Sequence, residues 1–448
     1  EGSALRADDG SRVEISNTFI DSSYSEGNGG GMLFYQSDYI SIKNSSFIAN
    51  RSVNGGGGIH VNEVDSLFID NCSFLSDSSD ASGTLDLGAG KFYSLKGVIM
   101  ENNYAAEGAG AINLGDNEKV EIIDSKFISN KSVTDGGAIY SWNTDSLFIK
   151  NSTFDGNEST DGNGGAMTVK GDVNSTLYSE IKNTTFENNS GGWGGAIAAF
   201  EPIDMNIDSV FAAGNEASGN GGFIELCCGA SVSITNSTIY NNETNNNDLN
   251  VNGSNLSIKN SIIWQDIIGG NAKGTIEVTY SDVEGGFTGT GNIDANPIFC
   301  DSWSGTWPQL AGNYHLTYLS PAIGSGENGV NMGAFDVGCD IDTALLSVDE
   351  PIDVTPTEYA LHDNYPNPFN PTTTLRFDLP EVSNLTLTIY NMLGQKVKTF
   401  NMHSTPAGYH SVKWNATNDY GDPVGAGVYL YQLQTKEFVK TRKMVLLK

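Results

Sequence analysis

The sequence is short of positive charge and has no long apolar run. Its 448 residues include 23 Lys and Arg against 54 Asp and Glu, which gives a net charge of −31 at pH 7. A surface this negative repels nucleic acid phosphates and anionic membranes, so we expect no nucleic acid partner. No apolar run approaches the roughly 18 residues of a membrane span, so we expect no membrane-spanning segment. Residues 358–448 hold nine basic and seven acidic side chains, so the preceding part of the chain carries −33.

Cysteine and proline are also scarce. Five cysteines cannot form a disulfide scaffold in a chain of this length. Cys300 and Cys339 flank one compact segment and could pair in an oxidising compartment, although five small buried thiols would explain the sequence equally well. The 12 prolines and 53 glycines favour many tight turns over a disordered linker. Because residues that favour helices are few and scattered, we expect an all-β fold.

A repeat of about 27 residues runs through the first part of the chain. The pattern I/L-x-N/D-x-x-F/I recurs, an Asn follows most of its last positions, and a Gly pair precedes the next apolar run. Short alternating apolar runs separated by Gly, Asn, Asp and Ser predict strands joined by turns. We expect the inward anchors of the repeat at Phe19, Phe47, Phe74, Met100, Phe127, Phe154, Phe186, Ala212, Ile239 and Ile263.

Units this small cannot bury an apolar side alone. We therefore expect them to stack at about 4.8 Å into a parallel β-solenoid of about ten coils. The anchors should form an internal column, and each recurring Asn should hydrogen-bond to its equivalents in the coils above and below. The first residues already have the pattern of a coil, with no polar cap before them. We expect residue 1 to be a cut inside a longer solenoid, or just after its cap.

The repeat resembles that of right-handed parallel β-helix proteins, in particular the bacterial surface proteins with GGAI…FxxN repeats. Gly136–Ile139, followed by Phe154 and Asn157, carries the resemblance. It implies the fold but not a function, because the same fold serves lyases, hydrolases, adhesins and inert stalks. Residues from about 266 to 342 resemble the closing segment of secreted bacterial β-helix proteins, and we interpret them as the last coils and a cap. The predicted first domain is thus residues 1–342.

The end of the chain has a different pattern. Residues 343–357 mix acids, Pro and Thr without a period, and we interpret them as a linker. Residues 358–448 contain about seven alternating runs with regular turn signals, which predicts a small immunoglobulin-like β-sandwich. Trp414 occupies a position suited to its core.

The sequence of this tail resembles the type A sorting domain that the type IX secretion system of Bacteroidota recognises. The main departure is Trp414–Asn418, which reads WNATN where the family has WDGTD, and it affects a turn. The resemblance implies export to the cell surface, with the type IX machinery as a partner and surface lipopolysaccharide as an anchor. The matching signal residues are Asn364, Pro366, Asn367, Pro368, Gly394, Gly427, Lys443, Met444, Val445, Leu446 and Lys448.

Three classes of function stay open: a structural or adhesive surface protein, a carbohydrate-binding module, and a polysaccharide-degrading enzyme. Glycosidases need paired carboxylates, and the polygalacturonase type shares Asn-Thr-Asp, Asp-Asp, Gly-His-Gly and Arg-Ile-Lys motifs on neighbouring coils. Asn143–Asp145 matches the first motif, but Asp8 and Asp9 lie about five coils away and the last two motifs are missing. We interpret Asp145 as part of a polar turn and predict no catalytic residue.

Lyase and metal chemistry also find little support. A β-helix lyase needs an Arg or Lys base beside carboxylates that hold calcium, whereas the solenoid's arginines all lie in its first coils and His60 is its only histidine before the cap. A lone His on a strand is better explained as a surface residue with satisfied hydrogen bonds. We expect no cofactor, with calcium at Asp155, Asn157 and Asp161 as an alternative that lacks the full 12-residue calcium loop.

The strands that follow the Gly pairs offer a candidate ligand-binding face. Alternation along these strands predicts that Phe34, Tyr140, Trp142 and Phe200 point outward. Solvent-facing aromatics suit sugar rings or a partner surface. We therefore predict a secreted, surface-displayed β-helix with a structural or adhesive role. Its expected partners are an extracellular polysaccharide or another surface protein, and carbohydrate binding or degradation is the alternative function.

Overall fold

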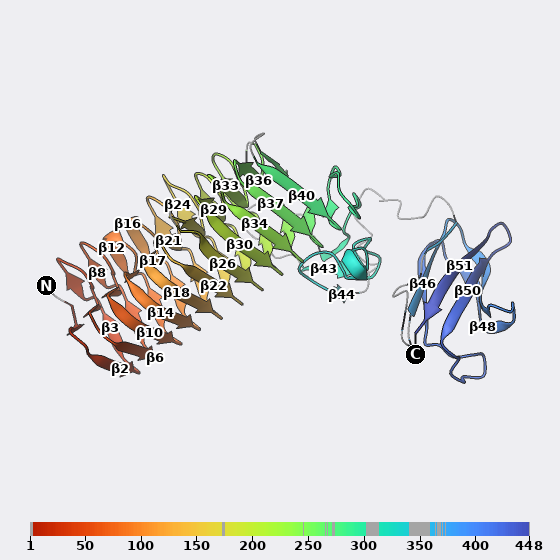
Figure 1. Cartoon of the computed structure of the whole chain (residues 1–448), viewed down its shortest axis with the longest axis horizontal. Helices are drawn as coiled ribbons and strands as arrows, with labels where there is room; N and C mark the ends of the chain where they lie inside the picture. The colour runs from red at the N-terminus through yellow and green to blue at the C-terminus, as the bar shows by residue number, and fades with distance from the viewer. Residues whose placement is uncertain are drawn as a thin grey trace. The chain divides into compact units, whose positions relative to one another are not determined.

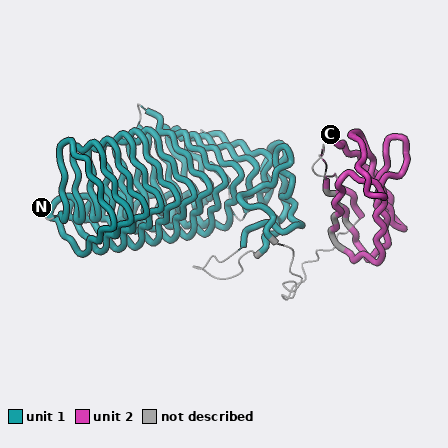
Figure 2. The backbone as a smooth tube through the Cα atoms, turned by 90° about the horizontal axis from the view of Figure 1, so that it is seen from below, with its two compact units in different colours: residues 1–339 teal, residues 340–448 magenta. Residues whose placement is uncertain are grey.

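The computed structural model describes residues 3–447 except 173–174, 245, 265, 267, 271–273, 302–312, 340–358, 363, 365–368, 370 and 372. The chain forms two compact units, residues 1–339 and 340–448 (Figure 2). The first unit ends close to the predicted boundary at 342, and the predicted linker, 343–357, falls outside the described residues. Within the described ranges, no helix is long and apolar enough to cross a membrane.

The first unit is a parallel β-solenoid in which each coil adds one strand to each of three sheets (Figure 1). We name these sheets A, B and C. The strands of sheet A are β1 (Leu5–Ala7), β5 (Met32–Tyr35), β9 (Ile59–Asn62), β13 (Leu85–Leu87), β17 (Ile112–Gly115), β21 (Ile139–Trp142), β25 (Met167–Lys170), β29 (Ile197–Phe200), β33 (Ile224–Cys227), β36 (Leu249–Asn252) and β39 (Ile268–Gly270). The strands of sheet B are β2 (Arg12–Ser16), β6 (Tyr39–Lys43), β10 (Val64–Asp70), β14 (Gly90–Lys96), β18 (Asn117–Ile123), β22 (Ser146–Lys150), β26 (Leu177–Lys182), β30 (Ile203–Asp208), β34 (Ser231–Thr235), β37 (Asn255–Lys259) and β40 (Thr275–Thr279).

Sheet C completes the three-sided coil, and a fourth sheet, D, is built from short strands at one corner. The strands of sheet C are β3 (Phe19–Asp21), β7 (Ser46–Ile48), β11 (Ser73–Leu75), β15 (Ile99–Glu101), β19 (Lys126–Ile128), β23 (Thr153–Asp155), β27 (Thr185–Glu187), β31 (Phe211–Ala213), β35 (Thr238–Tyr240), β38 (Ile262–Trp264) and β41 (Asp282–Val283). Those of sheet D are β4 (Tyr24–Ser25), β8 (Arg51–Ser52), β12 (Ser78–Ser82), β16 (Tyr104–Glu107), β20 (Lys131–Ser132), β24 (Glu158–Ser159), β28 (Ser190–Gly191) and β32 (Glu216–Ala217).

The predicted solenoid of about ten coils is confirmed, with 11 strands in each of sheets A, B and C among the described residues. The last of these coils contains β39, β40 and β41. Its residues, 268–283, lie in the segment that the sequence suggested for the closing coils and cap.

An internal column of side chains runs through sheet C. Phe154 stacks on Phe127 and Phe186 with ring centroids 4.6 and 4.9 Å apart and planes within 9° of parallel. The predicted anchor in the first coil was wrong by one residue. Ile20, not Phe19, pairs in register with Phe47, and Phe19 is 62% exposed. Counted from Ile15, the pattern I-x-N-x-x-F/I ends at Ile20. Phe19 was taken as the anchor because it is aromatic, like the anchors of other coils.

The predicted Asn ladder lies beside this column. The Asn130 Nδ2 donates to Asn157 Oδ1 at 3.0 Å and to the Met100 carbonyl at 2.9 Å, and both Asn side chains are fully buried. Equivalent bonds continue through Asn189, Asn215 and Asn242 to Asp266. Asn157, for example, bonds two backbone groups of the preceding coil, the Asn130 amide and the Phe127 carbonyl, and donates to the side chain of Asn189 in the next coil.

The Gly pairs close each coil where two backbones approach. Gly136 has φ +72°, and a Cβ on it would lie 2.1 Å from the Ile139 carbonyl oxygen. A Cβ on Gly137 would lie 2.0 Å from the carbonyl oxygen of Gly165 in the next coil. A side chain at either position would force the coils apart, which explains why the pair recurs.

A small cap packs beside the last coils. It contains β42 (Phe299–Asp301), β43 (Asn313–Thr317), the 3₁₀-helix η1 (Glu327–Gly329) and β44 (Val337–Cys339), and it has its own apolar cluster with Phe211 and Tyr240 of the solenoid.

The second unit consists of two antiparallel sheets around one apolar core, as predicted for a β-sandwich. Trp414 is buried in this core, as expected. One sheet contains β45 (Ala360–Leu361), β46 (Thr373–Leu379) and β49 (Gly408–Trp414). The other has the order β48 (Lys396–Thr405), β47 (Ser383–Asn391), β50 (Gly427–Gln434) and β51 (Val439–Leu446).

Candidate functional site

The predicted aromatic face on sheet A is present in part. Trp142 is 44% exposed and lies in register with Lys170, which in turn lies in register with Phe200. Tyr140 is half-buried, and burial raises the pKa of its phenol. These residues occupy two adjacent outward rows, and Lys170 stands between Trp142 and Phe200 in one of them.

Phe34 does not belong to this face. It is fully buried in the core, and Leu33 takes the outward position in register with His60. The prediction was wrong because it matched Gly30 and Gly31 to the Gly pair, whereas in the structure Gly31 takes the place of Ala138 and Met32 that of Ile139. A one-residue shift reverses the face of every side chain in a strand.

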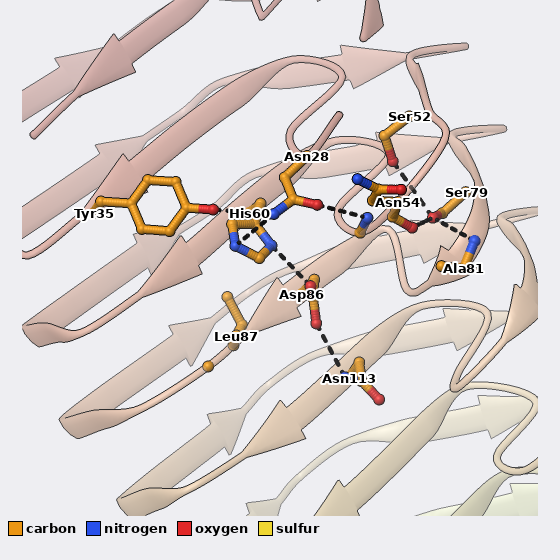
Figure 3. A network of polar contacts seen from close by, with 12 residues as sticks. Asn28, Tyr35, Ser52, Asn54, His60, Ser79, Ala81, Asp86, Leu87 and Asn113 are labelled. Carbon is orange, nitrogen blue, oxygen red and sulfur yellow. Dashed lines mark hydrogen bonds and ion pairs between the residues drawn. The ribbon is translucent and has the colours of Figure 1, made fainter. Parts of the chain in front are cut away.

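A polar network occupies the outward face of the first coils of sheet A (Figure 3). The His60 Nδ1 lies 2.7 Å from Asp86 Oδ2, and its Nε2 lies 3.3 Å from Asn28 Nδ2. Asn28 also donates to the Tyr35 hydroxyl at 3.0 Å, and Asn113 donates to the other oxygen of Asp86. Both ring nitrogens of His60 are therefore engaged, as expected for a histidine with satisfied hydrogen bonds.

Next to this network, a hollow of about 620 Å³ is lined by Tyr35 and several polar side chains. Two of its carboxylates already have partners: Asp8 accepts from Arg6 at 2.9 Å, and Glu63 accepts from Gln36 at 2.9 Å. The hollow can offer hydrogen bonds to hydroxyl groups. A third carboxylate, that of Asp9, also lines the hollow.

The Asn-Thr-Asp segment forms a turn before β22. Asn143 has φ +51° and donates to Asp116, Thr144 is buried, and Asp145 is exposed. The side chains that line the hollow come from other coils. The structure therefore gives Asp145 the place of a turn residue.

The calcium candidates do not converge. Asn157 is buried in the Asn ladder with its amide oxygen and nitrogen both bonded, so it cannot turn toward Asp155 or Asp161. Across the described ranges, no group of three or more His, Cys, Asp or Glu side chains is arranged to hold a metal ion.

The cysteines differ in state. Cys227 and Cys228, adjacent in sequence, form a disulfide that the sequence analysis did not anticipate, and Cys72 is a free, buried thiol. Burial raises the pKa of the Cys72 thiol to about 11. Cys300 is disulfide-bonded, but the side chain of Cys339 lies outside the described residues, so their pairing stays a prediction.

The predicted signal residues of the second unit fall into buried and exposed groups. Met444 and Leu446 are buried in the sandwich core, whereas Lys443 is exposed. Asn364 is buried and donates to Thr373 at 2.9 Å. Gly394 and Gly427 have φ of +76° and +153°, where other residues are strained. Pro366, Asn367, Pro368 and Lys448 lie outside the described residues.

A second outward surface escaped the sequence analysis. On sheet B, aromatic side chains of several coils point away from the core, and we name them, with the lysine among them, the outer track. The alternation in segments such as Ser66–Asp70 and Ser146–Lys150 carries the signal, because each places one aromatic between two inward apolar residues. The outer track comprises Tyr39, Phe68, Phe92, Lys119, Phe148 and Tyr178.

Comparisons with known proteins identify both units. Residues 1–157 match the family described as right-handed beta helix region, and residues 367–437 match the FlgD Ig-like domain. No curated protein matches the chain.

Three solved structures each match 20% of the chain. Latent PorU from Porphyromonas gingivalis is 23% identical, with 9% of its own chain covered and a TM-score of 0.18. PorZ, described as a surface component of the type IX secretion system of the same organism, is 21% identical, with 12% covered and a TM-score of 0.16. FlgD from P. aeruginosa is 25% identical, with 66% covered and a TM-score of 0.14. The match thus spans about a tenth of the first two proteins. The chain is an all-β protein with a right-handed parallel β-helix followed by an immunoglobulin-like domain.

Proposed function

We propose that this chain is a secreted protein displayed on the bacterial surface, where its β-helix has a structural or adhesive role. In this proposal the C-terminal unit is the export and anchoring module, read by the type IX machinery and linked to surface lipopolysaccharide. The observation that supports the proposal is a contact between the two separated parts of the predicted signal, made by Phe369, which follows Pro368 in the sequence, and the last strand. The Phe369 amide donates to the Val445 carbonyl at 2.9 Å, and the Leu447 amide donates to the Phe369 carbonyl at 2.8 Å.

The last strand has two faces with different roles in this proposal. Met444 and Leu446 point into the core, so they hold the strand in the sandwich. Lys443 and Leu447 are exposed, and Leu447 has 51% of its surface accessible. A receptor that binds the folded domain would contact these exposed side chains. The strand is the last of its sheet, and the Phe369 backbone pairs with its outer edge near Leu446.

Carbohydrate binding on sheet A is a second candidate, favoured by the exposure of Trp142 in the same row as Phe200. A polysaccharide-degrading role has less support, since two carboxylates of the hollow already have partners: Asp8 is ion-paired with Arg6, and Glu63 accepts a hydrogen bond from Gln36.

The export proposal is tested by expressing the full chain, behind a suitable leader, in a bacterium that has a type IX system. We expect the Lys443→Ala/Leu447→Ser variant to lose antibody labelling on intact cells. Removing the last six residues would be a poorer test, because it would also remove Met444 and Leu446 from the core and unfold the domain.

A matched control changes exposed residues earlier in the same region. Lys436 has 92% of its side chain accessible and Val439 is 56% exposed, so Lys436→Ala/Val439→Ser should leave labelling intact. The melting curves of the purified variants show whether the fold survives. Normal labelling of the Lys443→Ala/Leu447→Ser variant would contradict the export proposal.

A further inference from the structure

The outer track is a continuous line of side chains on sheet B. Ring centroids are 5.4 Å apart for Tyr39 and Phe68, 5.7 Å for Phe68 and Phe92, and 5.8 Å for Phe148 and Tyr178. The Lys119 ammonium bridges the remaining interval, 5.3 Å from the Phe92 centroid and 5.2 Å from that of Phe148. The line crosses the strands from β6 to β26, roughly 24 Å at the usual spacing between strands.

The rings of the outer track reach the solvent. Tyr178 is 36% exposed and the other four rings are half-buried. Some of their neighbours in register are small, with Ser66 between Tyr39 and Phe92 and Ser41 next to Phe68. Others are charged, and Phe148 lies between Glu121 and Glu180. A serine cannot cover an aromatic face, whereas the Arg12 guanidinium lies 4.1 Å from the Tyr39 centroid. Hydroxyl groups lie beside the rings.

Each named cation along the outer track is neutralised by a carboxylate. Lys119 pairs with Glu121 at 2.8 Å, and Lys150, which lies 5.6 Å from the Phe148 centroid, pairs with Glu180 at 2.9 Å. Because these pairs leave little local positive charge and the solenoid side of the chain carries −33, an anionic polymer would be repelled. The surface suits a ligand that has apolar faces and hydroxyl groups but no charge.

We propose that the outer track binds a single chain of a neutral polysaccharide. Sugar rings would stack their C–H faces on the aromatics, and their hydroxyls would bond to the serines and paired carboxylates. A protein partner fits less well, because the cores of protein interfaces are depleted of charged residues and here Lys119 and Glu121 lie at the centre. The inference deepens the proposed adhesive role and names its partner class. It does not depend on the export route.

The test uses the purified full chain in native affinity gels that contain hydroxyethylcellulose, xyloglucan, glucomannan or xylan, with polygalacturonate and alginate as the charged set. We expect retardation by at least one neutral polymer and none by the charged polymers. Phe68→Ser/Phe148→Ser should weaken the retardation at least about tenfold, the factor that 1.4 kcal/mol represents.

Three measurements separate the alternatives. Trp193→Ala removes an exposed ring that belongs to neither surface and should leave the retardation unchanged. Melting curves should show that this variant and Phe68→Ser/Phe148→Ser stay folded. Absence of retardation by all four neutral polymers, or equal retardation of the Phe68→Ser/Phe148→Ser variant, would overturn the proposal. Retardation by the charged polymers alone would also overturn it. So would a loss of retardation in a Trp142→Ala/Phe200→Ala variant, which lacks the aromatics of sheet A, but not in Phe68→Ser/Phe148→Ser. A wild-type dimer in sedimentation that Phe68→Ser/Phe148→Ser dissociates would assign the outer track to chain–chain contact instead.

Discussion

The same coils carry two lines of aromatic rings, one inside the solenoid and one outside. The inner rings, such as Phe127 and Phe154, are fully buried and nearly parallel, at 4°. The outer rings are tilted by 37° to 66°, and they alternate between two rows. The inner column continues with apolar residues through the described coils, whereas the outer track stops at Tyr178. The inner column runs through every coil, so the stacking of coils explains it. The outer track is confined to part of the solenoid, so stacking alone does not explain it.

One coil contains both Phe148 of the outer track and Phe154 of the inner column, so substitutions in this coil compare the two lines of rings most directly. We expect Phe154→Ala to lower the free energy of unfolding by about 3–5 kcal/mol, because it removes a buried ring between two others. Phe148→Ala should cost less than about 1.5 kcal/mol, since its ring is only partly buried. Urea unfolding followed by circular dichroism measures both. Equal losses would contradict the division into an inner and an outer line.

The Asn ladder is the polar counterpart of the inner column. Asn157→Ala would leave the Asn130 amide groups and the Phe127 carbonyl without their partner, so we expect a loss of about 2–3 kcal/mol by the same measurement. Asn206→Ala, on the outward side of sheet B, should change stability by less than about 0.5 kcal/mol. A neutral result at Asn157 would show that the ladder is not needed for stability.

At one position of the Asn ladder, an aspartate stands in place of the asparagine. Asp77 occupies an Asn position, its Oδ1 accepts from Asn50, and its buried Oδ2 has no hydrogen-bond partner. Burial raises the pKa of Asp77 to about 7. The native state therefore holds a proton that the unfolded chain has released, and stability falls as the pH rises from about 4 to 7.

Asp77→Asn restores a donor to the ladder. We expect a gain of about 1–2 kcal/mol at pH 8 and a weaker dependence of the melting temperature on pH between 5 and 8. Burial also raises the pKa values of Glu187, Glu225 and Asp282 to about 7, so some dependence should remain. Asp80→Asn, at an exposed residue paired with Arg51, is the matched control and should retain the wild-type slope. Identical slopes for all three proteins would refute this account of Asp77.

How far the sequence predicts the structure depends on which contacts repeat. The column and ladder were predictable because stacking requires like residues at like positions, as at Phe127, Phe154 and Asn157. Phe34 was misplaced because Gly31 stands where other coils have Ala, and Phe19 was chosen as an anchor because its ring lies next to the true anchor, Ile20. The outer track was missed because its rings alternate between two rows, so no single position of the repeat contains an aromatic in successive coils. Its continuity depends on distances between coils, which a one-dimensional pattern does not contain.

We propose that the inner line of rings holds the fold and that the outer track binds a ligand. The most direct measurement is the melting temperature and the retardation on a neutral polysaccharide of one protein, Phe68→Ser/Phe148→Ser, beside the wild type. We expect this variant to melt within a few degrees of wild type, as is usual for surface changes, and to be retarded at least about tenfold less. Unchanged retardation, or a loss of retardation that arises only because the protein unfolds, would contradict this proposal.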